Sequence, residues 1–356
     1  IIEKGGKKFE ICSVSNGKYT VLNDDIAYQF VKNIEITKDS NGVNIIQVEV
    51  ENPTNYNFNV IKKDAAENNV KGSKFTAYRE DSNGNIKQVL NNEELKIINE
   101  TPMRAGNYIY YITETATPGK QYVNVLEGKY MKVYVHLDAN GRLTITNSNF
   151  VGSEKYYELY EGDITTRNGK KINNDSCISV SVDSRGTAST EKTLVINVVN
   201  PVTYNLDIVK QDTTGKSLAN SKFKVRRQVV STNSNDKIFD DAVNDKVEVT
   251  ENRMLAGNYI YYIKETSSPA TKYCNILEDG YLKLYVKVYG NGKVTLTNSK
   301  FEDSTSYYEW RKGNIDDPKD TDTLVATSGP MGRFVKVYVQ ESNSIYTIRV
   351  EVKNPL

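Results

Sequence analysis

The sequence predicts an all-β protein made of tandem antiparallel β-sandwich domains arranged end to end. Segments rich in Val, Ile, Thr and Tyr alternate apolar and polar residues, as strands with one buried face do. Asn-Gly pairs, which favour tight hairpin turns, separate such segments, and a long internal repeat predicts the tandem arrangement. No long segment has helical periodicity. The one short candidate, residues 91–99, is expected to form at most a turn of helix in a loop.

The chain repeats itself with an offset of about 150 residues, which is the size of a folding domain rather than of a solenoid unit. The matching anchors are 56–62 with 204–210, 105–115 with 256–266, and 198–201 with 352–355 and 50–53. They divide the chain into residues 1–53, 54–201 and 202–356. The last two are complete copies. The first corresponds to the C-terminal part of a preceding copy, and any secretion signal is expected to be removed or to lie outside this sequence.

Composition excludes several classes of function. The 46 Lys and Arg against 45 Asp and Glu give a net charge of +1, which argues against a nucleic-acid partner bound through its phosphates. No apolar run is long enough to cross a membrane. A single histidine, His136, and three widely spaced cysteines, Cys12, Cys177 and Cys274, form neither a catalytic set nor a metal-ligand pattern. We therefore expect no metal and no cofactor.

Strand parity places three kinds of polar residue on inward faces. Side chains two apart in a strand share a face, so Lys62 continues the apolar face of the first strand of its copy, and Lys210 does the same in the next. In the last strand of each copy, Asn200 and Asn354 continue the apolar face, as Asn52 does in the partial copy.

In a middle strand, Glu114 and Glu265 share parity with inward tyrosines and isoleucines. Each complete copy therefore buries one Lys, one Glu and one Asn, although an unpaired buried charge costs several kcal/mol. One explanation is an ion pair at the end of the sheet, with Asn bonded to the backbone and Lys reaching toward water.

The other explanation is chemical. Burial lowers the pKa of a lysine and raises that of a glutamic acid, so the amine becomes a nucleophile and the protonated acid polarises the Asn carbonyl. Loss of ammonia then leaves a Lys–Asn isopeptide bond, and both buried charges disappear.

The sequence resembles CnaB-type domains, the SpaA-like, prealbumin-like modules of Gram-positive surface adhesins and pilins. The resemblance rests on the Lys that ends the first strand, on Glu-Thr-x-x-Pro at 114–118 and 265–269, and on the terminal Asn-Pro. It implies immunoglobulin-like sandwiches with two cross-linking triads. Glu114 would catalyse the Lys62–Asn200 bond and Glu265 the Lys210–Asn354 bond, with Asn52 as a cross-linking residue of the incomplete domain.

The expected function is the stalk of an extracellular, cell-wall-attached adhesin or surface fibre. The chain is expected not to be an enzyme, because each isopeptide bond forms once. Its partners are neighbouring copies in the same chain. The alternative is an adhesin module that binds host matrix protein or glycan through insertions near residues 80–100, 160–190, 228–250 and 312–330. Tyrosines of outward parity, such as Tyr111 and Tyr134, are candidates for a sticky face, that is, an exposed aromatic surface that binds sugar or protein.

Overall fold

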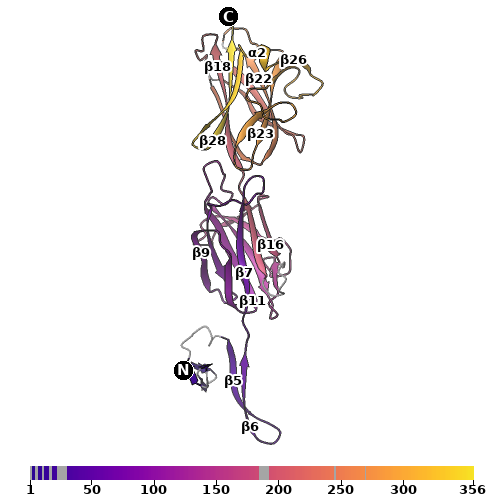
Figure 1. The fold of residues 1–356 in the computed structure, drawn as a ribbon. Helices are drawn as coiled ribbons and strands as arrows, with labels where there is room; N and C mark the ends of the chain where they lie inside the picture. Colours follow the sequence, from indigo (N-terminus) through magenta and orange to yellow (C-terminus); the bar gives the residue numbers. More distant parts are fainter. Residues whose placement is uncertain are drawn as a thin grey trace.

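The structure, a computed structural model, describes residues 2–4, 7–9, 12–15, 18–21, 30–183, 192–243, 246–268 and 270–356. It confirms the all-β prediction: within these ranges the single helix is the four-residue α2 (Ser328–Met331). A β-hairpin and two sandwiches follow one another along a long axis (Figure 1). Residues 54–201 form the middle sandwich and residues 202–356 the C-terminal sandwich.

The middle sandwich packs a four-stranded sheet against a seven-stranded sheet. The four-stranded sheet comprises, in order, β10 (Ile98–Met103), β7 (Thr54–Lys63), β17 (Thr193–Val199) and β16 (Ile178–Asp183). The larger sheet comprises, in order, β15 (Lys170–Ile172), β14 (Glu158–Glu161), β12 (Lys129–Leu137), β11 (Gly106–Ala116), β8 (Lys74–Glu80) and β9 (Ile86–Glu94), with β13 (Leu143–Thr146) paired to β12.

The C-terminal sandwich repeats this topology. Its four-stranded sheet comprises, in order, β21 (Lys246–Met254), β18 (Val202–Asp212), β28 (Ile345–Asn354) and β27 (Val335–Ser342). Its larger sheet comprises, in order, β20 (Ser234–Val243), β19 (Lys222–Val229), β22 (Gly257–Ser267), β23 (Gly280–Val288), β25 (Glu309–Lys312) and β26 (Thr323–Thr327), with β24 (Val294–Thr297) paired to β23.

The first and last strands of each sandwich are parallel neighbours. β7 pairs with β17, with Lys62 opposite Val198, and β18 pairs with β28, with Lys210 opposite Val352. Alternating side chains of β7 are buried from Tyr56 to Lys62, as the period of two predicts. The apolar sides of the two sheets form one core in each sandwich.

The expected turn of helix at residues 91–99 is wrong. β9 continues to Glu94 and pairs with β8, and β10 begins at Ile98 and pairs with β7. The backbone hydrogen bonds of both halves go to neighbouring strands, so tertiary pairing overrides a weak local preference.

The described part of the N-terminal segment comprises six strands in three antiparallel pairs. These are β1 (Ile2–Lys4) with β2 (Lys7–Phe9), β3 (Cys12–Ser15) with β4 (Lys18–Val21), and the longer hairpin of β5 (Val31–Lys38) with β6 (Asn44–Val50). Ile46, Val48 and Val50 on β6 are about half exposed or more. The β5–β6 hairpin matches the last two strands of each complete sandwich, whose corresponding side chains are covered by the facing sheet.

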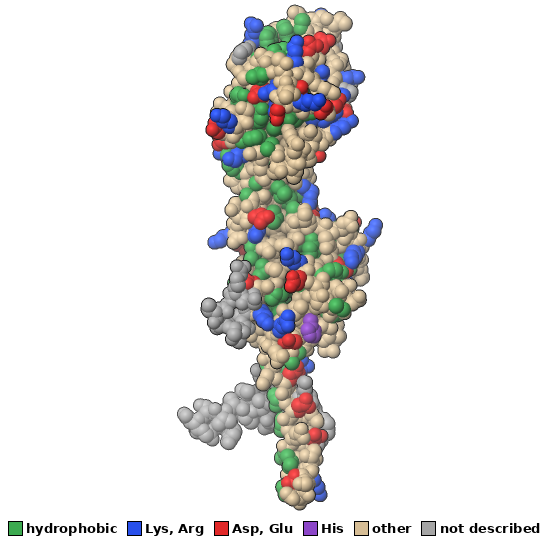
Figure 2. All heavy atoms as spheres, turned by 90° about the vertical axis from the view of Figure 1, so that its right-hand side faces the viewer, with side chains coloured by type: hydrophobic (Ala, Val, Ile, Leu, Met, Phe, Trp, Pro, Cys, Tyr) green, Lys and Arg blue, Asp and Glu red, His purple; other side chains and the backbone are tan. Residues whose placement is uncertain are grey.

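The two sandwiches dock through a joint of main-chain hydrogen bonds. The amide of Ala65 donates to the carbonyl of Gly290 at 3.3 Å, and the amide of Ala256 donates to the carbonyl of Ala65 at 3.1 Å. Ala65 is buried in the core cluster of the C-terminal sandwich, although it belongs to the middle one. An ion pair of 2.6 Å between Arg253 and Asp175 adds a contact at the side of the joint. In Figure 2 the molecule is a narrow column, with charges of both signs scattered over the face in view.

Candidate functional site

The structure brings Lys62, Glu114 and Asn200 together inside the middle sandwich. Lys62 lies near the end of β7, and Asn200 follows β17 directly, with its amide donating to the carbonyl of Lys63 at 3.0 Å. Glu114 comes from β11 in the facing sheet, so the site lies between the two sheets. The three residues are only 1%, 3% and 0% exposed.

Glu114 is the centre of a hydrogen-bonded cluster. Lys62 Nζ donates to Glu114 Oε2 at 3.2 Å, and Asn200 Nδ2 donates to Oε1 at 3.0 Å. A fourth residue, Ser73, donates its hydroxyl to Oε1 at 2.9 Å. The carboxylate therefore contacts both the amine and the carboxamide that an isopeptide bond would join.

The C-terminal sandwich contains the same cluster. Lys210 Nζ donates to Glu265 Oε2 at 2.7 Å, and Asn354 Nδ2 lies 3.1 Å from Oε1 and 3.3 Å from Oε2. All three side chains are fully buried. Lys210 Nζ also lies over the ring of Phe223, 6.0 Å from its centroid. Two copies that differ in most of their sequence thus place the same three groups in the same relation.

Burial shifts both acid–base groups toward their neutral forms. It lowers the pKa of the Lys62 amine and of the Lys210 amine to about 8, although the neighbouring glutamates act in the opposite direction. It raises the pKa of Glu114 and of Glu265, against the lowering effect of the lysines. Moving one proton from Lys to Glu would remove both charges from the dry interior.

The amide oxygens of Asn200 and Asn354 are buried without a hydrogen-bond partner. A buried acceptor left unpaired costs about 1–3 kcal/mol, so native structures rarely keep one. Rotating the amide by half a turn would present its oxygen to the glutamate, and a protonated glutamate could then donate to it. The site is therefore suited to a neutral acid that polarises the amide carbonyl.

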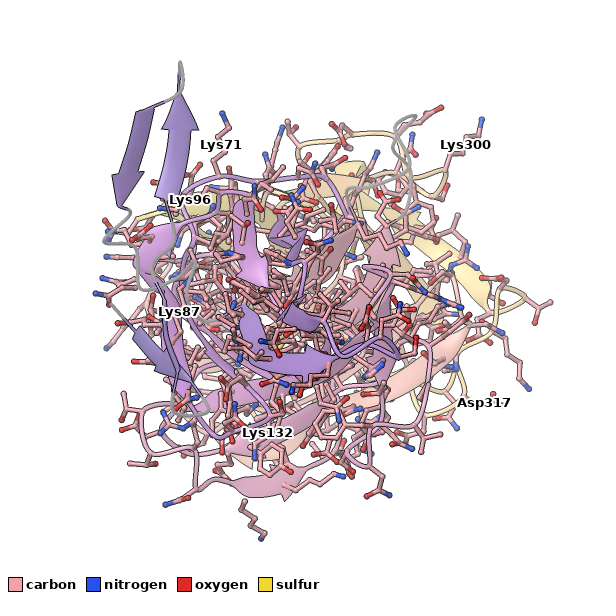
Figure 3. The ribbon with its side chains drawn as sticks, turned by 90° about the horizontal axis from the view of Figure 1, so that it is seen from below. Lys71, Lys87, Lys96, Lys132, Lys300 and Asp317 are labelled. Atoms are coloured by element: carbon pink, nitrogen blue, oxygen red, sulfur yellow. The ribbon has the colours of Figure 1, made fainter. Side chains whose placement is uncertain are left out.

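Three other lysines among the described residues are in a different environment. Viewed along the long axis, Lys71 and Lys300 point away from the ribbon (Figure 3) and are exposed. Lys63, the neighbour of Lys62 with opposite parity, is partly exposed and lies 3.8 Å from Glu67. Lys62 and Lys210 thus differ from these lysines in having a buried acid and a buried amide as neighbours.

Asn52 has no such surroundings. It is exposed, and the described residues bring neither a lysine nor a glutamate to it in the way they do for Asn200. Cys177 is buried and Cys274 exposed. In the described ranges, no group of three His, Cys, Asp or Glu residues could hold a metal ion, and no helix is long and apolar enough to cross a membrane.

The expectation of a sticky face at Tyr111 and Tyr134 is wrong. Both are about 5% exposed, because the chain after β12 folds back over the outer face of the larger sheet. Ile164 packs with Tyr111, and Tyr134 donates its hydroxyl to the buried Glu158 at 2.8 Å. Parity identified the outer face correctly, but it could not reveal that a later segment covers it.

Much of the insertions is regular structure. Residues 80–100 contain all of β9 and the start of β10, and residues 228–250 contain all of β20 and the start of β21. Their main-chain hydrogen bonds extend the sheets of each sandwich.

A second buried polar cluster was not predicted. Arg79 pairs with the fully buried Glu100, which accepts a hydrogen bond of 3.2 Å from Tyr110, and Tyr110 lies 2.5 Å from the hydroxyl of Tyr56. In the C-terminal sandwich, the matching residues are Arg227, Glu251, Tyr261 and Tyr204. Tyr56 lies near the start of β7 and Lys62 near its end, so this cluster is at the opposite end of the sandwich from the Lys–Glu–Asn site.

Ser73 and its counterpart Ser221 were also missed. Each precedes a Lys-Phe pair that opens the second strand of its copy. The recurrence of Ser-Lys-Phe at matching positions was the available signal, but neither serine lies on an alternating strand, so parity did not apply to it.

No protein-family model matches the chain, and no curated protein matches it. Among solved structures it is similar to the pilus adhesin SpaC of Lactobacillus rhamnosus GG in an open conformation, at 15% identity and a TM-score of 0.29 over 95% of this chain and 36% of that chain. A C-terminal fragment of the same adhesin aligns at 16% identity and a TM-score of 0.29, over 85% of this chain and 97% of the fragment. BcpA, the major pilin subunit of Bacillus cereus, aligns at 14% identity and a TM-score of 0.20, over 85% of this chain and 99% of that chain.

Proposed function

We propose that this chain is part of the extracellular stalk of a Gram-positive cell-surface adhesin or pilin, in which each complete sandwich cross-links itself. The observation that carries the proposal is the burial of Lys, Glu and Asn in hydrogen-bonding contact in both sandwiches, where a glutamate of the facing sheet meets the ends of the first and last strands. An ion pair serving stability alone would not require the asparagine, whose amide oxygen stays unpaired in both copies.

The chemistry follows from these contacts. Lys62 transfers a proton to Glu114, and the neutral amine attacks Cγ of Asn200, whose carbonyl oxygen accepts a hydrogen bond from the protonated acid. The Nζ–Cγ bond forms and the Cγ–Nδ2 bond breaks. Glu114 passes a proton to Nδ2, which completes the leaving ammonia, and takes up a second proton from the lysine nitrogen. Lysine and asparagine become an amide, neutral ammonia leaves, and Glu114 stays protonated, so neither buried charge remains.

The reaction occurs once per sandwich, so the chain is not an enzyme with turnover. The amine and the carboxamide are both consumed, and the product amide fills the dry interior without charge. Lys210, Glu265 and Asn354 perform the same steps in the C-terminal sandwich.

The position of the bond suits a stalk under tension. β7 enters the middle sandwich at Thr54, and the chain leaves it after Asn200 at the other end. Because β7 and β17 are parallel, pulling the ends would shear these strands past each other. A Lys62–Asn200 amide at the exit end carries the tension directly from β7 to Asn200.

The docked joint supports the stalk function as well. Ala65 is buried in the neighbouring sandwich, and several main-chain hydrogen bonds cross between the two units. Such a joint keeps consecutive units in line, which suits a rod that holds a binding region away from the cell wall.

Intact mass measurement tests the proposal. The wild-type mass is expected to fall short of the sequence mass by two ammonia, and fragmentation should locate the bonds at Lys62–Asn200 and Lys210–Asn354. Glu114→Gln and Glu265→Gln should each prevent one of the two bonds, so each variant should be only one ammonia lighter than its own sequence mass. Lys63→Gln is the matched control and should lose both ammonia. A wild-type mass equal to the sequence mass would refute self-cross-linking.

A ligand-binding adhesin module is the competing function. Specific binding of the isolated chain to matrix proteins or to glycans on an array, together with an uncross-linked mass, would favour it over the stalk.

A further inference from the structure

The serine beside each catalytic glutamate is the feature that the proposed reaction does not use. Ser73 is 1% exposed and lies just before β8, where its hydroxyl donates to Glu114 Oε1 at 2.9 Å. The register of β11 against β8 shifts between Glu114 and Ala116, which marks a β-bulge directly after the glutamate. Such bulges re-aim a side chain next to a functional site.

The C-terminal sandwich places Ser221 in the same position. It is fully buried, and the register of β19 against β22 also shifts next to it, between Lys222 and Phe223. Its Oγ makes no hydrogen bond of good geometry, yet it is close enough to Glu265 for its hydroxyl to lower the pKa of that acid. Here Asn354 contacts both oxygens of Glu265. The hydroxyl of Ser73 is therefore hydrogen-bonded to its glutamate, whereas that of Ser221 lies beside its glutamate without a well-formed hydrogen bond.

We infer that Ser73 and Ser221 are positioning residues that set the protonation of the catalytic glutamate and direct one of its oxygens to the lysine. The inference rests on the proposed cross-linking function and adds a fourth residue to each site.

Hydrogen-bond direction supports this role. Ser73 occupies Oε1 together with Asn200, which leaves Oε2 of Glu114 to Lys62. A hydroxyl that donates to a carboxylate favours the ionised form. Burial raises the pKa of Glu114, and the serine opposes this effect. It therefore keeps the carboxyl group ionised, which is the form that can accept the lysine proton.

The lysine and the glutamate titrate as a pair, so the reaction should have a bell-shaped pH profile. The reactive pair holds one transferable proton. At low pH both groups are protonated, so the amine cannot attack. At high pH the pair has lost its proton, so no protonated glutamic acid is left to polarise the amide carbonyl. Since the serine stabilises the ionised glutamate, it extends the acidic limb of the profile to lower pH.

Few other charges face these acids. Lys62 on β7 faces Glu114, and the buried Cys177 thiol, whose pKa burial raises to about 11, acts on Lys62. Lys210 on β18 faces Glu265. The serine hydroxyl can thus be removed without disturbing another charged pair.

The test follows cross-linking in chains that have not yet reacted. The full chain is purified in denaturant, refolded at values between about pH 5 and pH 9, and sampled by intact and peptide mass for ammonia loss in each sandwich. Ser73→Ala should move the acidic limb for the Lys62–Asn200 bond up by about 1–2 pH units, the effect of one hydrogen bond to a charged group. The Lys210–Asn354 bond in the same molecule is the internal control and should keep its profile.

Three further variants separate positioning from a structural role. Ser73→Thr retains a hydroxyl and should restore the acidic limb. Ser221→Ala should shift the limb of the C-terminal sandwich in the same direction, but less, because its hydroxyl is not well bonded to the acid. Thr76→Ala removes a buried hydroxyl from β8 that accepts from the amide of Asn92, and should leave the profile in place.

The outcomes are distinct. If Ser73→Ala slows the reaction by the same factor at every pH, or changes nothing, the serine is only structural and the inference is wrong. If Ser73→Ala does not refold, an unshifted limb in Ser221→Ala overturns the inference. If the refolded wild type loses no ammonia at any pH, the proposed function itself fails.

Discussion

Replacing Lys62 by Met is expected to convert the middle sandwich from an inextensible unit into one that unravels under force. Met fills the apolar position at the end of β7 without an amine, so no isopeptide bond forms and no buried charge is left behind. Glu114 can then stay protonated, with Ser73 and Asn200 still beside it. The change removes the covalent link while preserving most of the packing.

The released length follows from the topology. In the cross-linked chain, tension passes from β7 through Lys62 to Asn200, and residues 63–199 lie outside this path. Without the bond these residues extend once β7 and β17 shear apart. At 3.3–3.6 Å per residue they add roughly 450–490 Å of contour length, before subtraction of the folded span.

Single-molecule force spectroscopy measures this length. The wild-type chain should show no unfolding step from either sandwich, and Lys62→Met should show one step of the stated size. Lys210→Met is the matched variant in the other copy. Steps of this length in a wild-type chain of verified cross-linked mass would refute the proposed force path.

Three other perturbations have defined outcomes. Lys210→Met should lower the melting temperature of the C-terminal sandwich by about 10–20 °C in calorimetry, since closing a loop of this size stabilises by about 5 kcal/mol; a shift within error would show that the bond contributes little. Glu100→Gln leaves Arg79 without its buried partner, and should destabilise the middle sandwich by about 3–5 kcal/mol in urea unfolding while ammonia loss in the folded protein continues. At Gly290, a Cβ would lie 2.5 Å from Asp64 Oδ2 of the middle sandwich, so Gly290→Val should push the two sandwiches out of line. Small-angle scattering should show a bent molecule with an unchanged melting temperature. Ala139→Val, the equivalent substitution in the hairpin of the middle sandwich, should leave the molecule straight.

The inward position of the Lys, Glu and Asn side chains could be predicted because a strand has a period of two. Lys62 and Asn200 are separated widely in sequence, but each continues an apolar row, and rows of that kind must face a core. Their mutual contact is a further step that parity does not give. The prediction that the three meet rested on the resemblance to CnaB-type domains, and the repeat added only that the same three residue types recur at matching positions.

Other parts of the molecule could not be predicted in this way. Tyr111 lies on the outer face of its strand and is buried because the segment containing Ile164 returns over it, a long-range event without a local signal. Glu100 is buried by its pairing with Arg79, which comes from a different strand. Ser73 lies outside the strands, and its position depends on a bulge that only the folded register reveals.

Tension and bending are resisted by different parts of the molecule. The proposed covalent path runs along β7 to Lys62, crosses to Asn200, continues into β18 as far as Lys210 and crosses again to Asn354. None of the hydrogen bonds between Ala65 and the C-terminal sandwich lies on this path. The isopeptide bonds would therefore limit extension, and the docked joint would limit the angle between sandwiches. A variant of the joint should bend without stretching, and a variant of the triad should stretch without first bending, so the two properties can be changed independently in the same chain.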